Sequence, residues 1–256
     1  MYELSYVGGK VLKSSSSVLL DELISHDYSL RFTCTGLCYN EKDHLFYVGN
    51  IGASTPADFG NGRSTIMVLS EGLDTCLYEL AIADTFPAMK DIQGVTYDPV
   101  DHTLWFCSFS ENKVRHISLK GNPLLQFAIQ QPTGIAYDSK RDALWILTYS
   151  ELLLISKEGE VRVRYPIEID GQDQLFYDSI KDRILMTAGL DYQGTGLVFE
   201  IHPENGYRKV LYRLIDSHAI EGIVLKNNQL FIANDGYYHQ AKIPFNQINV
   251  YELGNQ

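Results

Sequence analysis

The side chains best suited to chemistry gather towards the C-terminal end of the chain. The stretch EGIVLKNNQLFIANDG begins with Glu221 and ends with an adjacent Asn234 and Asp235. Asp173 opens a related stretch upstream. Carboxylate and amide oxygens without Cys or His are hard ligands, which suit Ca²⁺ or Mg²⁺ better than zinc. The candidate metal ligands are therefore Asp173, Glu221, Asn234 and Asp235, and the expected cofactor is calcium or magnesium.

The same oxygens have a simpler use, which the sequence leaves open. Buried carboxylates and amides often hydrogen-bond the backbone of incoming loops and hold ordered water. In that case no cation is bound.

Two histidines lie close enough in sequence to serve such a site as general bases. His218 precedes Glu221 by three residues, and His239 follows Asp235 by four. Both are candidate catalytic residues. The alternative is that each is an ordinary loop histidine.

Three predicted loops are longer than the others, residues 50–64, 189–196 and 234–247. Long loops on a rigid scaffold are common places for binding. Their aromatic and amide side chains suit a sugar, a lactone-like ring or a peptide, unless the loops only pack on one another. Together with two residues that begin repeated stretches, the candidate ligand contacts are Asn50, Phe59, Gln93, Thr133, Tyr192, Tyr237 and Tyr238.

The composition is that of a globular protein with a sizeable core. Of the 256 residues, 45% are hydrophobic and 21% are charged, and the formal net charge is −11. The densest basic stretch, VRVRYP, offers two arginines, too few to follow a phosphate backbone. We therefore expect neither nucleic acid nor a membrane as a partner. An acidic surface suits a cation, a cationic partner or solubility alone.

The N-terminal segment predicts a cytoplasmic location. Lys10, Lys13 and four serines interrupt it, so it lacks the apolar run of a signal peptide. No stretch approaches the roughly 18 apolar residues of a membrane-spanning helix. The four cysteines fit a reducing compartment, because Cys34 and Cys38 in an extended segment would be about 13 Å apart, too far for a disulfide.

A repeat in the sequence predicts the fold. Each copy is a short apolar run, a polar turn and a second apolar run, which is the pattern of a β-hairpin. Successive copies are about 40 to 60 residues apart, close to the spacing of four-stranded propeller blades. The five copies are TGLCYNEKDHLFYVGN (35–50), QGVTYDPVDHTLWFCSFS (93–110), TGIAYDSKRDALWILTYS (133–150), DQLFYDSIKDRILMTAG (173–189) and EGIVLKNNQLFIANDG (221–236).

Four copies are followed by two more strand-like runs, but the fifth is followed only by INVYEL (248–253). Its missing outer strand is expected from residues 1–20, which would close the ring and remove a sheet edge. We therefore predict an all-β chain, with residues 1–256 forming a single five-bladed β-propeller of four-stranded antiparallel blades. The predicted blades are about 33–84, 92–130, 132–168, 172–216 and 219–254. A six-bladed propeller with a degenerate blade in residues 1–32 is the alternative.

A propeller brings the candidate residues together. The inner strand of each blade lines a central channel, and the loops entering these strands share one face with the loops joining second and third strands. We call this the top face. The entering positions are Thr35, Gln93, Thr133, Asp173 and Glu221.

EGI at Glu221 and LFIANDG at residues 230–236 resemble blades of the calcium-dependent propellers, which include the gluconolactonase and paraoxonase group and the SdiA-regulated and phytase-like proteins. The repeated hairpins also resemble NHL-type propellers. The resemblance implies that a strand-entry Glu and a loop Asn or Asp meet a central metal ion. It also implies further channel ligands, for which this chain offers Asn50 and Asp173.

Three functions remain open. The first is a recognition propeller that binds a small molecule, glycan or protein at its top face. The second is a calcium-dependent hydrolase of the lactonase or esterase type, in which the cation polarises a carbonyl. The third is a structural component of a larger assembly. The sequence does not indicate an oligomeric state.

Overall fold

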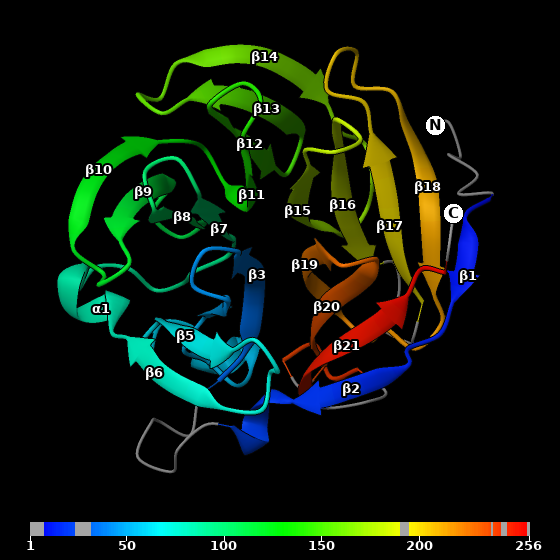
Figure 1. Cartoon of the computed structure of the whole chain (residues 1–256). Helices are drawn as coiled ribbons and strands as arrows, with labels where there is room; N and C mark the ends of the chain where they lie inside the picture. Colours follow the sequence, from blue (N-terminus) through cyan, green and yellow to red (C-terminus); the bar gives the residue numbers. More distant parts are fainter. Residues whose placement is uncertain (1–7, 24–31, 190–194, 237, 242–244, 255–256) are drawn as a thin grey trace.

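The computed structural model describes residues 8–23, 32–189, 195–236, 238–241 and 245–254. Five sheets, antiparallel apart from one added strand, stand around a central axis like the blades of a propeller (Figure 1). The prediction of a five-bladed, all-β propeller is confirmed.

The first three blades follow the chain without interruption, from the inner strand outwards. Blade one is β3 (Cys34–Asn40), β4 (Leu45–Asn50), β5 (Thr65–Ser70) and β6 (Cys76–Leu80). Blade two is β7 (Val95–Asp98), β8 (Thr103–Ser108), β9 (Lys113–Ser118) and β10 (Pro123–Ala128). Blade three is β11 (Pro132–Asp138), β12 (Ala143–Thr148), β13 (Glu151–Ser156) and β14 (Val161–Pro166).

The last two blades recruit the N-terminal segment. Blade four is β15 (Gln172–Asp178), β16 (Arg183–Gly189), β17 (Gly196–Ile201) and β18 (Arg208–Leu214). Blade five is β19 (Ile220–Lys226), β20 (Gln229–Asp235) and β21 (Asn246–Glu252), completed by β2 (Ser16–Leu19). The antiparallel pairing of β2 with β21 is the predicted closure of the ring. A further strand, β1 (Lys10–Leu12), pairs in parallel with β18 and gives blade four a fifth strand that the repeat did not predict.

Helical structure within the described residues is limited to short turns: α1 (Ile82–Thr85), η1 (Leu20–Glu22) and η2 (Pro56–Asp58). None of these described helices has the length and apolar character needed to cross a membrane.

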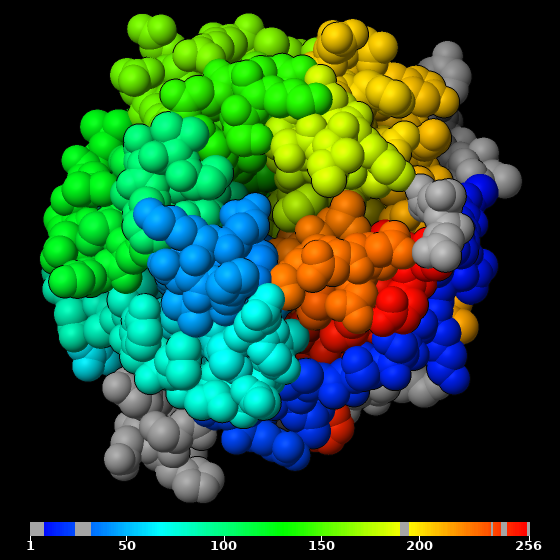
Figure 2. Space-filling model, in the orientation of Figure 1, coloured from blue at the N-terminus to red at the C-terminus, as the bar shows by residue number. Residues whose placement is uncertain are grey.

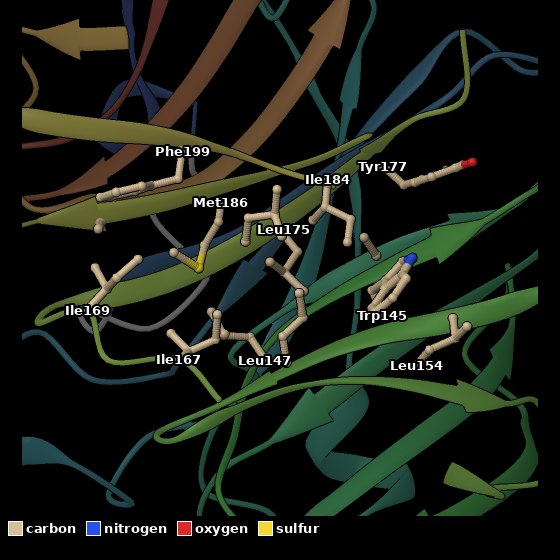
Figure 3. Close-up of a cluster of buried hydrophobic side chains, with 14 of the residues drawn as sticks. Trp145, Leu147, Leu154, Ile167, Ile169, Leu175, Tyr177, Ile184, Met186 and Phe199 are labelled. Carbon is tan, nitrogen blue, oxygen red and sulfur yellow. The ribbon is translucent and has the colours of Figure 1, made fainter. Parts of the chain in front are cut away.

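The hydrophobic core is divided among the interfaces between neighbouring blades. Five buried clusters lie at the five blade contacts of the ring. Figure 3 shows the one between blades three and four, where Trp145 and Leu147 meet Leu175 and Met186. Because the central strands are covered on both faces, they are apolar throughout, as in LWFC and LWIL, instead of alternating.

Glycines allow the inner strands to approach one another closely. A Cβ on Gly134 would lie 2.6 Å from the carbonyl oxygen of Asp173, and one on Gly222 would lie 2.7 Å from that of Thr35. Only glycine fits at such distances. In the fourth blade the equivalent position holds Gln174, whose side chain is buried in the channel itself.

Four of the five sequence repeats have a tyrosine at the same position, near the end of the inner strand. These tyrosines stabilise the hairpins on the face opposite the top face, which we call the hairpin face. Each tyrosine hydroxyl hydrogen-bonds a side chain five residues later, where the backbone has a positive φ. The pairs are Tyr39 with His44, Tyr97 with His102, Tyr137 with Asp142 and Tyr177 with Asp182. The space-filling view shows the blades packed side by side around a hollow near the centre (Figure 2).

Candidate functional site

A cavity of about 520 Å³ lies at the top-face mouth of the channel. Every blade contributes to its lining, including all five entering positions, Thr35, Gln93, Thr133, Asp173 and Glu221. The volume is within the usual range for small-molecule pockets.

Irregularities at the start of the inner strands place these side chains at the channel mouth. The pairing register shifts between Cys34 and Leu37 in β3, and equivalent shifts occur in β11, β15 and β19. Such bulges turn a side chain out of the regular alternation of a strand. Asp173 and Glu221 lie within two of these bulges, so the carboxylates of neighbouring blades come together.

Asp173 and Glu221 share a hydrogen bond between their carboxyl groups. Burial raises the pKa of Asp173 to about 7, and the charge of Asp235 adds to the shift while the bond with Glu221 opposes it. Burial also raises the pKa of Glu221 well above its usual value, and the charges of Asp173 and Asp235 raise it further. A hydrogen bond between two carboxyl groups requires one of them to carry a proton.

Asp235 and His239 line the cavity together with Asp173 and Glu221, and we call these four residues the floor of the cavity. The Nδ1 atom of His239 lies 2.8 Å from Oδ1 of Asp235. Burial raises the pKa of Asp235 although His239 opposes the shift. Burial lowers the pKa of His239, but the bond to Asp235 and the charges of Asp235 and Asp173 outweigh it and raise that pKa overall.

The backbone holds Asp235 beside the entry of β19. The amide of Asp235 donates to the carbonyl oxygen of Ala219 over 3.0 Å, and Ala219 has a φ of 55°. A non-glycine residue in this left-handed region costs of order 1–3 kcal/mol, which the surrounding structure must offset. Such strain is common near functional sites.

Three ligand atoms at the floor are close enough to share a metal ion. One atom each from Glu221, Asp235 and His239 lies within 4.8 Å of the others. Two carboxylates and an imidazole suit a transition metal or zinc, whereas Ca²⁺ and Mg²⁺ take oxygen ligands. The donors fit a divalent cation, but the histidine fits calcium less well than the sequence motif implied.

The two asparagines among the predicted residues lie away from this floor. Asn234 accepts a hydrogen bond of 2.6 Å from the hydroxyl of Ser217 and donates to the carbonyl oxygen of Ile232. Asn50 accepts from the amides of Thr33 and Gly52. Neither side chain is among the cavity lining, so the structure does not join them to Glu221.

The remaining predicted residues divide into three groups. Phe59, Gln93, Thr133 and Tyr238 line the cavity. His218 is buried in the segment before β19 and is not part of the lining. Tyr192 and Tyr237 lie outside the described residues.

Two aromatic side chains of the lining were not predicted. Phe109 and Tyr149 follow β8 and β12, and their rings meet edge to face with centroids 5.4 Å apart. The fully buried Asp91 holds the first of these turns by accepting the amide of Phe109 over 2.8 Å. Both turns are short, so loop length did not reveal them.

A second cavity, of about 460 Å³, lies at the hairpin face and is lined by the four recurring tyrosines. Gln174 lies between the two cavities. Its Nε2 atom donates to the carbonyl oxygens of Gln93 and Thr133 over 2.9 Å each. The side chain thereby links blade four to blades two and three within the channel.

Solved structures with similar folds include propellers of other proteins. A chain of a nidogen/laminin complex is 15% identical, with a TM-score of 0.54 over 78% of this chain and 72% of that one. A protein of unknown function from Bacteroides caccae is 12% identical, with a TM-score of 0.53 over 80% and 72%. The Pan2 WD40 domain of Neurospora crassa is 12% identical, with a TM-score of 0.50 over 95% of both chains. The likeness is one of fold.

No family model matches this chain, and no curated protein matches it. At such low identities, the similar structures show the propeller architecture and assign no activity. Membership of the NHL or calcium-dependent groups stays a prediction from the sequence motif.

Proposed function

We propose that this chain is a recognition propeller that binds a positively charged ligand in its top-face cavity. The observation that carries the proposal is the floor of that cavity, where the carboxyl groups of Glu221 and Asp235 lie close to the imidazole of His239. A third carboxyl group, that of Asp173, hydrogen-bonds Glu221. Burying like charges together is unfavourable unless a proton or a cation offsets them. A bound cation removes that cost.

Among the expected partners, a small molecule or a protein segment with a positive group suits this floor. The hydroxyls of a neutral glycan can donate hydrogen bonds to these carboxyl groups, but a glycan brings no positive charge to offset them. One similar structure belongs to a nidogen/laminin complex, which supports a protein partner by analogy of fold only.

The experiment is a thermal-melting screen with positively charged, neutral and negatively charged compounds of similar size. We expect positive compounds alone to raise the melting temperature, because binding to the folded state stabilises it. The Glu221→Gln variant should lose that response. Equal stabilisation by all three classes, retained in the variant, would refute the proposal.

A metal-dependent hydrolase is the second candidate, favoured by the clustering of Glu221, Asp235 and His239. A divalent cation held there would act as a Lewis acid on a carbonyl, and a histidine that does not bind the cation would handle protons. Metal analysis of the purified protein and ester or lactone hydrolysis before and after chelation provide the test. A metal-free protein without turnover on added Ca²⁺, Mg²⁺, Mn²⁺ or Zn²⁺ would exclude this candidate.

Docking in a larger assembly is the third candidate. The outer strands β6 and β10 expose Leu77, Tyr78, Leu124 and Leu125, each at least 44% exposed. Exposed apolar residues on blade edges are typical of interaction surfaces when they form a patch. Sedimentation of the wild type and a Leu124→Ser, Leu125→Ser double variant in cell extract would show whether these residues hold a complex together.

A further inference from the structure

The top-face cavity combines two features that metal binding alone would not use. Its floor is anionic, and its walls include the aromatic rings of Phe59, Phe109, Tyr149 and Tyr238. This inference rests on the proposed function, since it concerns the chemical class of the ligand in the same cavity.

Glu221 shows that the floor needs a positive partner. Its side chain is 4% exposed and lines the cavity, and within the described part of the chain its only side-chain hydrogen bond is to another carboxyl group, Asp173. Within the described residues no Lys or Arg forms an ion pair with it, and the nearby His239 pairs with Asp235 instead. A buried carboxylate in this position is a strong acceptor for a ligand that brings its own positive charge.

The walls indicate what kind of positive charge fits. The rings of Phe109 and Tyr149 meet at an interplanar angle of 83°, so they enclose a corner. Tyr238 lies close to the floor: burial raises the pKa of its hydroxyl, and the nearby charges of Asp235 and Glu221 raise it further. Aromatic faces attract organic cations, and recognition of quaternary ammonium groups by several rings is a common use of this attraction.

A bare metal ion matches the cavity less well. The volume of about 520 Å³ is far larger than one ion requires. The amide oxygens of Asn50 and Asn234, which would complete an oxygen shell, are engaged elsewhere. An alkylammonium group would fill the space, contact the rings and place its charge over the carboxyl groups.

We propose that the cavity binds an organic ammonium group, with the charge towards Glu221 and Asp173 and the alkyl substituents against the aromatic walls. The group could belong to a free amine or to a methylated lysine of a protein, and these share the same chemistry. The experiment separates the two sources.

Calorimetric titration with choline and with 3,3-dimethylbutan-1-ol tests the proposal, because the alcohol has the same shape without the charge. We expect choline to bind at least about tenfold more tightly, as a desolvated cation–π contact with nearby carboxylates predicts. A peptide with trimethyl-lysine, compared with the same peptide with unmodified lysine, shows whether the source is a protein. Tighter binding of the methylated peptide than of choline supports the proposal and assigns that source.

Two variants locate the binding. Tyr149→Leu should weaken choline binding about 3- to 10-fold, because it removes one ring. Tyr149 is 62% exposed, so the change should not affect folding, and Tyr207→Leu, at 60% exposed and outside the lining, is the matched control. Glu221→Gln should weaken choline binding by a larger factor than Tyr149→Leu does.

Equal affinity for choline and the neutral alcohol overturns the proposal, and so does unchanged binding in Tyr149→Leu. Binding of a divalent cation but not of choline also overturns it while leaving the proposed function in place. If no positively charged compound binds, the proposed function fails as well.

Discussion

The side-chain nitrogen of Gln174 in blade four donates to the carbonyl oxygen of Gln93 in blade two, 2.9 Å away across the channel. The same nitrogen donates to Thr133 of blade three. One side chain therefore links three blades at the channel.

Replacing Gln174 with Met should destabilise the propeller by about 1–3 kcal/mol, because the volume is kept while both carbonyl oxygens lose a donor. Urea denaturation measures this change. Gln126→Met on the exposed strand β10 is the control and should have little effect. Equal stability of the two variants would mean that Gln174 does not link the strands.

The close approach of inner strands predicts an unusual sensitivity to a single methyl group. Gly222→Ala should cost at least about 2 kcal/mol, because a Cβ there would lie 2.5 Å from Cβ of Leu37. Gly72→Ala is the comparison, since the nearest atom to its Cβ would be 3.6 Å away. Thermal unfolding of both variants would show whether the channel is packed as tightly as described.

Ring closure by the N-terminal segment can be tested at Leu20. This side chain is fully buried against blades five and one, so Leu20→Ala should cost about 2–5 kcal/mol. Leu124→Ala on the edge of blade two, 54% exposed, should change stability little. A similar small effect at both sites would show that the closing segment contributes little to the ring.

The buried carboxyl groups predict that the ligand-free protein loses stability as pH rises. The folded pKa of Asp173, about 7, exceeds the unfolded value, so its stabilising contribution is complete below about pH 4 and disappears as pH rises through 7. Glu221, Asp235 and His239 have raised pKa values and act in the same direction. Melting temperatures measured between pH 5 and pH 8 should therefore fall.

Asp173→Asn serves as the control for this profile and should flatten it. Carboxyl groups with lowered pKa values do not mask the effect, because Asp182, with a pKa of about 2, loses its contribution only in stronger acid. Burial lowers the pKa of His116, which acts in the opposite direction in this range, so the decisive quantity is the difference between the wild-type and Asp173→Asn profiles. A wild-type melting temperature that rises from pH 5 to pH 8 would contradict the described floor.

Much of the fold could be predicted because each blade repeats one pattern. The hairpin copies and their spacing indicate the number of blades, and the lone strand after the fifth copy requires a partner from elsewhere. Strand β1 could not be predicted in the same way. Its three residues carry no periodic signal, and its parallel pairing with β18 depends on where the ring closes.

The site could be predicted only in part. Asn234 and Asp235 are consecutive in a strand, so their side chains point to opposite sides, and only one can face the channel. Which one does so depends on the bulge at the entry of β19, and a bulge has no clear sequence signature. Likewise, Gln174 stands where the other copies have glycine, but only the ring geometry shows that its side chain fills the channel.

The central claim is that a positively charged group binds directly over the carboxyl groups of Asp173 and Glu221. Calorimetry near pH 7 in two buffers of different ionisation enthalpy counts the protons exchanged on binding. Because a cation lowers the pKa of nearby carboxyl groups, we predict the release of up to about one proton per ligand bound, and less release in Glu221→Gln. Binding without proton release, identical in wild type and variant, would contradict the claim.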